Sequence, residues 1–201
     1  MANESRFDEL LRRLRDTEKE LESEIDRLLD EQRQRFHYKL EHGKVKFEER
    51  IHAYQRQYRV GTWRYLREAK LRYILSAPFI YAMIIPLLIQ DISFTVYQHI
   101  CFRIYGIPLV KRSEFFVIDR HLLEYLNAIE KFNCVYCGYG NGVIAYSREI
   151  TSRTEQFWCP IKHAKRISYK HSRVDKFFEY GDASAWRTDL KAIRKDWDDN
   201  H

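Results

Sequence analysis

The run of residues 73–90 constrains the fold of this chain most, because it contains no charged side chain over 18 consecutive positions. After Asp91 the apolar pattern resumes and continues to Phe102, directly before Arg103. A bilayer core about 30 Å thick needs about 20 apolar residues at 1.5 Å per residue, so residues 73–90 are at the lower limit of a spanning helix. The full stretch 73–102 is long enough, but Asp91 lies near its middle and costs about 2.5–3.5 kcal/mol in lipid.

Three arrangements of this stretch stay open. Pro78 and Pro86 each remove a backbone donor, which kinks or breaks a helix unless neighbours or water satisfy the freed carbonyl. The stretch therefore forms a kinked transmembrane helix, a helical hairpin that enters and leaves the membrane on one face, or a buried helix of a soluble bundle. The mean hydropathy of −0.58 excludes a polytopic membrane protein but allows one membrane segment.

A basic collar precedes the apolar stretch. From Lys44 to Arg72 there are nine Lys or Arg residues and three Glu, with aromatic residues between them. Such a surface suits either nucleic-acid phosphates or anionic lipid headgroups. Because the apolar stretch follows directly and no base-reading motif is present, we expect membrane lipids as the partner and not nucleic acid. The excess of Lys and Arg places this collar on the cytoplasmic side.

The first 60 residues differ in composition from the rest, with six aromatic residues and no Cys. Their apolar residues recur at spacings of three and four, which predicts one charged amphipathic helix. These residues are Phe7, Leu10, Leu11, Leu14, Leu21, Ile25 and Leu28. Glu18, Gln32 and Arg35 interrupt a coiled-coil seam of about three heptads. The helix therefore packs on its own chain, or it associates with a second copy or another protein.

The cysteines provide the candidate site. Cys134-x2-Cys137 is followed by Cys159-x3-His163, and three thiolates with one imidazole suit a structural Zn²⁺ ion, with Fe as the alternative. Gly138, directly after the second Cys, is typical of the knuckles of rubredoxins and zinc ribbons. Thiolate sites persist where thiols stay reduced, so we expect this region to face the cytoplasm.

The chain length between the two halves limits this ligand set. If residues 143–158 form one straight helix, it is roughly 24 Å long. Residues 138–142 extend at most about 17 Å. Joining Cys137 to Cys159 through one ion is then barely possible, unless the helix is shorter than the spacing of its apolar residues indicates.

A second geometry divides the ligands. Helices over residues 119–132 and 143–158 would form an antiparallel hairpin, with the Cys-x2-Cys turn at its tip. The dithiol then lies at the tip, and a cluster of His121, Cys159 and His163 lies at the base. A redox pair formed by Cys134 and Cys137 is a further alternative, since Cys-x2-Cys is also the thioredoxin-type motif.

Several short stretches are distinctive: Val-Gly-Thr-Trp-Arg-Tyr-Leu-Arg (60–67), Tyr-Gly-Ile-Pro (105–108), Asp-Arg-His (119–121), Tyr-Leu-Asn (125–127) and Arg-Thr-Glu-Gln-Phe-Trp-Cys-Pro-Ile-Lys-His (153–163). In these stretches the chain resembles a family of uncharacterised bacterial proteins. The resemblance covers about residues 55–185, and its most distinctive part is the Cys-Pro-Ile-Lys-His end. It implies a bacterial origin and a membrane-associated segment, but no established activity.

Together these patterns predict a mainly α protein in three parts. A charged helical arm covers residues 1–60, the basic collar and apolar membrane segment cover 61–103, and a small helical metal-binding domain covers 104–201. We expect a non-enzymatic, membrane-associated protein with a structural zinc or iron site, in the bacterial inner membrane and facing the cytoplasm. A membrane-bound thiol redox enzyme and a metal-handling protein are the alternatives.

Overall fold

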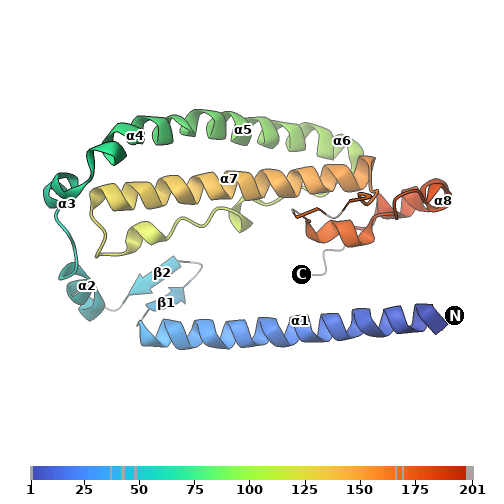
Figure 1. Cartoon of the computed structure of the whole chain (residues 1–201), viewed down its shortest axis with the longest axis horizontal. Helices are drawn as coiled ribbons and strands as arrows, with labels where there is room; N and C mark the ends of the chain where they lie inside the picture. The colour runs from blue at the N-terminus through green and yellow to red at the C-terminus, as the bar shows by residue number, and fades with distance from the viewer. Residues whose placement is uncertain are drawn as a thin grey trace. The chain divides into compact units, whose positions relative to one another are not determined.

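The computed structural model describes residues 2–36, 38–41, 44–47, 49–165, 167–168 and 170–197. The described chain is mainly helical, as predicted, with one small sheet (Figure 1). It divides into two compact units: residues 1–61 with 122–127, and residues 62–121 with 128–201. The apolar segment and most of the C-terminal region, which we expected as separate parts, fall in the second unit, whereas residues 122–127 fall in the first.

The first unit begins with a single long helix. α1 (Ala2–Arg35) follows the predicted amphipathic pattern, and Arg27 forms exposed ion pairs along it with Glu24 and Glu31. It is followed by β1 (Tyr38–Glu41), β2 (Lys44–Phe47) and α2 (Glu49–Arg56). The two strands pair antiparallel, with Tyr38 opposite Phe47. These strands are not among the sequence predictions, although their alternation of apolar and charged residues is typical of a hairpin.

The second unit contains the apolar stretch as a helix. After α3 (Thr62–Glu68) come α4 (Leu71–Ala82), α5 (Ile84–Tyr97), the π-helical turn η1 (Gln98–Phe102) and α6 (Arg103–Tyr105). These last four elements form the apolar helix, Leu71–Tyr105, whose 35 residues extend roughly 52 Å. The junction between α4 and α5 lies at Met83, three residues before Pro86. Pro86 has no N–H to donate to the carbonyl of Ala82, four residues earlier, which explains a break at this point.

The apolar helix ends at a turn, as Gly106 and Pro108 predict from the sequence. Gly106 has a positive φ of 70°, a conformation that glycine adopts without strain. The N–H of Ile107 then donates to the carbonyl of Phe102 at 2.9 Å, which closes a Schellman-type cap. Pro108 follows and prevents the helix from continuing.

The chain next runs back along the apolar helix and then forms a second long helix. The return segment, residues 107–121, contains the short 3₁₀ turn η2 (Arg112–Glu114), and η3 (Arg120–Leu122) begins at its end. α7 (Ala128–Trp158) then runs beside the apolar helix in the same direction (Figure 1). Tyr81 donates to Asn133 at 2.7 Å, and Tyr97 lies 3.1 Å from the Thr154 hydroxyl, as a parallel pair requires.

The sequence prediction of two helices over 119–132 and 143–158 is wrong. α7 begins at Ala128 and continues without interruption through the region that we expected to be a turn. The reason lies in its glycines. A Cβ on Gly142 would lie 2.8 Å from the Phe116 ring, and one on Gly138 would lie 3.3 Å from the Val117 carbonyl oxygen. The glycines therefore let the return segment pack against the helix, and they do not mark a turn.

The core of the second unit lies toward the C-terminal ends of its two long helices. Its buried cluster comprises Phe102, Ile107, Val110, Tyr146 and Ile150. We call the described chain after Trp158 the tail. It covers this end of the two helices with η4 (Ser172–Lys176) and α8 (Ala183–Ile193). Asp182 caps α8 by accepting a hydrogen bond from the Ala185 N–H at 2.9 Å.

Candidate functional site

The predicted zinc ligands lie at two different ends of one helix. Cys134 is in the second turn of α7 and half-buried, and Cys137 is in the third turn and exposed. Cys159 is exposed directly after the helix ends at Trp158, and His163 is exposed farther along the tail. All four cysteines of the chain are free thiols.

The helix between them is too long for a shared ion. Cys137 and Cys159 are separated by roughly 33 Å at 1.5 Å per residue, whereas zinc holds its ligands at about 2.0–2.3 Å. Within the described part of the chain, no group of three or more His, Cys, Asp or Glu side chains is placed to hold a metal ion. The structure therefore does not bring Cys134, Cys137, Cys159 and His163 together as one site.

The divided ligand set is not formed either. His121 lies in η3, before α7 begins, whereas Cys159 and His163 follow the end of that helix. For His121, Cys159 and His163 to form one cluster, all three would have to lie at the same end of α7. Metal binding stays a prediction, without a candidate cluster among the residues that the structure describes.

The geometry of the Cys pair also does not favour disulfide chemistry. Side chains three residues apart on an α-helix have Cβ atoms about 5–6 Å apart, whereas a disulfide needs about 3.5–4.5 Å. Oxidation of Cys134 and Cys137 would therefore require distortion of α7. The pair also lies inside α7 and not at its N-terminus, where the thioredoxin-type motif places its reactive thiol.

The most prominent feature of the second unit is instead an exposed apolar surface. The apolar helix is the one helix among the described residues that is long and apolar enough to cross a membrane, and only 6% of its most apolar 18-residue window is buried. We call its exposed side the outer face. It comprises Leu71, Leu75, Phe79, Ile85, Ile89, Ile92, Val96, Ile100 and Ile104. A soluble protein rarely leaves such a continuous apolar surface uncovered.

The opposite side of the same helix packs against the return segment and α7, and it contains a buried carboxylate whose hydrogen bonds are satisfied. Asp91 is buried and accepts hydrogen bonds from both terminal nitrogens of Arg112 in the return segment, one of them at 2.7 Å. Tyr139 of α7 donates to the same carboxylate at 2.8 Å. The Arg112 guanidinium also lies 3.9 Å from the centre of the Phe116 ring. The carboxylate that the sequence marks as costly in lipid is therefore neutralised within the unit.

A second polar side chain, Gln98, holds the return segment at a point farther along the apolar helix. Gln98 is fully enclosed, and its Nε2 donates to the Tyr146 hydroxyl. Its Oε1 accepts from the Val110 N–H at 3.0 Å. Sequence reasoning identified neither Arg112 nor Gln98, since their importance comes from partners distant in the chain. The uncharged neighbourhood of Gln98 is the one sequence signal that singles it out.

The tail is fastened to α7 by a cluster of ion pairs. Glu149 accepts hydrogen bonds from Arg153 at 2.7 Å and from the buried Arg173 at 2.8 Å. Burial raises the pKa of the Glu149 carboxyl, but the hydrogen bonds from the two arginines outweigh this effect and hold its pKa below the ordinary value. Gln156 adds a further connection, donating to the Ile193 carbonyl at 3.0 Å.

Comparison of the chain with protein families, with curated proteins and with solved structures gives no match in any of the three. The resemblance to bacterial membrane-associated proteins stays a prediction.

Proposed function

We propose that this protein is a non-enzymatic membrane-associated protein, held at the lipid surface by the outer face of its apolar helix and able to bind a partner through α1. The observation that carries the proposal is the uncovered apolar surface of Leu71–Tyr105. Burying one large apolar side chain contributes about 1.5–3 kcal/mol, so a surface of this length supplies ample free energy for lipid attachment.

The two faces of the second unit support lipid contact on one side only. At 100° per residue, Ile89 lies about 160° around the helix from Asp91. The return segment packs on the Asp91 side, and it carries the exposed ion pair of Lys111 and Glu114, whose side chains are 78% and 58% accessible. The apolar surface and the charged surface therefore face opposite directions.

This asymmetry favours a helix that lies along the membrane surface over one that spans it. Lys111 and Glu114 lie beside the middle of the apolar helix, because their neighbour Arg112 pairs with Asp91. In a spanning orientation these charges would be at the depth of the hydrocarbon core, at a cost of about 2.5–3.5 kcal/mol for Lys alone. In the plane of the membrane, the outer face enters the lipid while the return segment stays in water.

Basic residues just before the apolar helix and in its first turn support the same placement. Arg64, Arg67 and Arg72 are exposed beside Trp63, whose side chain is 82% accessible. Basic residues attract anionic headgroups, and Trp prefers the interface between lipid and water. On this basis we propose the cytoplasmic face of the bacterial inner membrane as the location.

The partner site that we propose is α1. Its described apolar side chains Leu21, Ile25 and Leu28 are exposed at spacings of four and three residues. Such a stripe suits a second copy of the chain or an amphipathic helix of another protein. The predicted zinc or iron site is not part of this proposal, because the four ligands are not brought together.

Membrane fractionation of the full chain tests the proposal. We expect the wild-type protein to sediment with membranes after washes in high salt and in alkaline carbonate. The double variant Phe79→Lys/Ile89→Lys should shift to the soluble fraction, since each Lys opposes lipid contact by up to about 3 kcal/mol. The matched control is Ser113→Lys/Thr151→Lys, which adds the same charges at exposed positions away from the outer face. Equal sedimentation of the two variants would disprove attachment through the outer face.

A further inference from the structure

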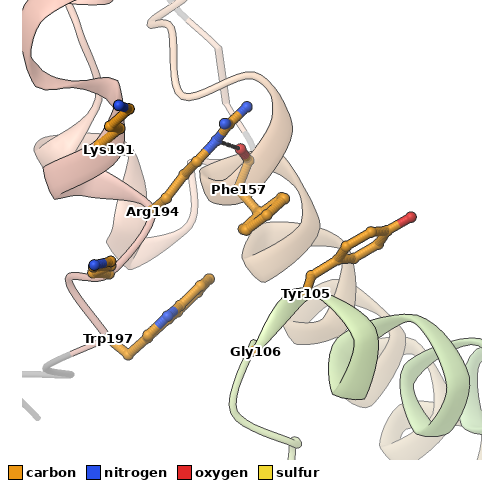
Figure 2. A pocket seen from close by; sticks show the side chains of 7 residues that line it. Tyr105, Gly106, Phe157, Lys191, Arg194 and Trp197 are labelled. Atoms are coloured by element: carbon orange, nitrogen blue, oxygen red, sulfur yellow. Dashed lines mark hydrogen bonds between the residues drawn. The ribbon is translucent and has the colours of Figure 1, made fainter.

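A pocket of about 490 Å³ lies where the apolar helix, α7 and the tail converge. Figure 2 shows that its walls come from three parts of the second unit. Tyr105 and Gly106 end the apolar helix, Phe157 belongs to the last turn of α7, and the remaining walls come from the tail. The tail residues are Lys191, Arg194, Lys195 and Trp197.

The pocket is strongly cationic. Three of its seven lining residues are basic and none is acidic. Within the described residues, neither Lys191 nor Lys195 takes part in an ion pair. Asp196, which lies between Lys195 and Trp197 in the sequence, pairs with Lys176 at 2.9 Å. The two lysines therefore leave an excess of positive charge at the pocket.

Arg194 has a different role from the two lysines. Its Nε donates to the Phe157 carbonyl at 2.7 Å, and its guanidinium lies 4.9 Å from the centre of the Phe157 ring (Figure 2). It thus satisfies a carbonyl in the last turn of α7 and is held in place by that contact. The Arg194 guanidinium adds to the positive charge of the pocket, but its contact with the C-terminal end of α7 holds it in place.

The remaining walls are aromatic. The rings of Tyr105 and Phe157 stack with their centroids 5.2 Å apart, and Trp197 lines the same space. Aromatic rings beside basic side chains are typical of the boundary between lipid and water. The pocket lies at such a boundary if the outer face is in lipid, because Tyr105 is the last residue of the apolar helix.

We propose that this pocket binds the phosphate group of an anionic lipid headgroup. Lys191 and Lys195 contact the phosphate, while the aromatic side chains contact the glycerol and the start of the acyl chains. The volume is within the range of about 300–1,000 Å³ that small-ligand pockets occupy. With no acidic group in its walls, the pocket disfavours the ammonium group of a zwitterionic lipid. This inference depends on the proposed membrane association, which brings the lipid to the pocket.

Binding of short-chain lipids to the full chain in a non-ionic detergent tests the inference. Calorimetric titration should show saturable binding of dioctanoyl phosphatidylglycerol, and much weaker binding of dioctanoyl phosphatidylcholine and of inorganic phosphate. Lys191→Ala and Lys195→Ala should each weaken phosphatidylglycerol binding about fivefold, the equivalent of about 1 kcal/mol per charge. Arg187→Ala, which removes the same charge from an exposed position of α8 outside the pocket, is the matched control and should leave binding nearly unchanged.

Three outcomes would overturn the inference: equal affinity for the two lipids, equal affinity for inorganic phosphate and phosphatidylglycerol, or equal effects of Lys191→Ala and Arg187→Ala. The assay needs no membrane, so its result is separable from the fractionation test. A chain that sediments with membranes but lacks selective binding refutes the pocket alone. A chain that binds the lipid but stays soluble refutes the proposed membrane association.

Discussion

Arg112 lies against Asp91, with its two terminal nitrogens donating to the two carboxylate oxygens. Arg112 belongs to the return segment and Asp91 to the apolar helix, so this ion pair fixes where the return segment lies along the helix. Tyr139 donates to the same carboxylate at 2.8 Å and connects α7 to the pair. The Asp91 carboxylate therefore connects three segments in the middle of the second unit: the apolar helix, the return segment and α7.

Replacing Arg112 should destabilise the second unit more than replacing its partner. Arg112→Ala removes the cationic partner of the buried Asp91 carboxylate and leaves it the hydrogen bonds from the Tyr139 and Thr95 hydroxyls, and we expect a loss of about 1–3 kcal/mol in the free energy of unfolding. Asp91→Asn removes the charge itself and should cost less. Tyr139→Phe removes one hydrogen bond and should cost about 0.5–1.5 kcal/mol. Denaturant unfolding followed by circular dichroism in detergent measures all three, and a larger loss for Asp91→Asn than for Arg112→Ala would contradict this reasoning.

The ion pairs of Glu149 predict a loss of stability in acid. Because its pKa is held below the ordinary value, the stabilisation is fully present above about pH 4.3, the ordinary pKa of a free Glu. It is lost as the pH falls through the lower pKa of the folded state. Thermal unfolding measured across the acid range should show this decline in the wild type and a flatter profile in Glu149→Gln. The exposed Glu114→Gln is the control, and a wild-type profile identical to that of Glu149→Gln would refute the assignment.

The contact between Gly142 and Phe116 predicts a strong effect of side-chain size on α7. Gly142→Val places methyl groups where the Phe116 ring already lies, since even a Cβ would be 2.8 Å from it. We expect a loss of about 2 kcal/mol or more in the free energy of unfolding. Ala145→Val, at an exposed position of the same helix, should cost only a few tenths of a kcal/mol through helix propensity. Similar losses for both variants in denaturant unfolding would mean that Gly142 is not a packing position.

The separation of the cysteines predicts independent thiols. In native, reduced protein, Cys137 and Cys159 are both exposed, so both should react with a maleimide at rates that a metal chelator leaves unchanged. Mass spectrometry of the labelled peptides measures each rate. Cys101, which is half-buried, provides an internal reference for slow labelling. A chelator-dependent rise in both rates together would reinstate the four-ligand metal site.

The sequence predicts the elements whose signals are local. The uncharged run 73–90 becomes a helix, the spacing of leucines after Phe7 becomes α1, and the turn at Gly106 and Pro108 ends the apolar helix. Each of these signals is contained within a few helical turns of chain, so no knowledge of tertiary partners is needed.

The candidate site could not be predicted in the same way. Gly138 and Gly142 are equally typical of a turn and of a helix that another segment approaches closely, and only the position of Phe116 distinguishes the two. The cost of Asp91 in lipid depends on Arg112, whose contact with it is set by the path of the return segment. The predicted zinc ligands do not form one site because α7 is continuous between them. The prediction required a turn at the glycines, whereas these glycines let the return segment pack closely against the helix.

The parallel arrangement of the two long helices also has a consequence for biosynthesis. The apolar helix is complete at Tyr105, whereas α7 starts only at Ala128. During translation the ribosome therefore releases every residue of the apolar helix before the first residue of the helix that packs on it. Until the return segment and α7 have emerged, the side of the apolar helix that carries Asp91 has no partner from the later part of the chain. The order of synthesis thus favours capture of the apolar helix by lipid or by a chaperone before the second unit has folded.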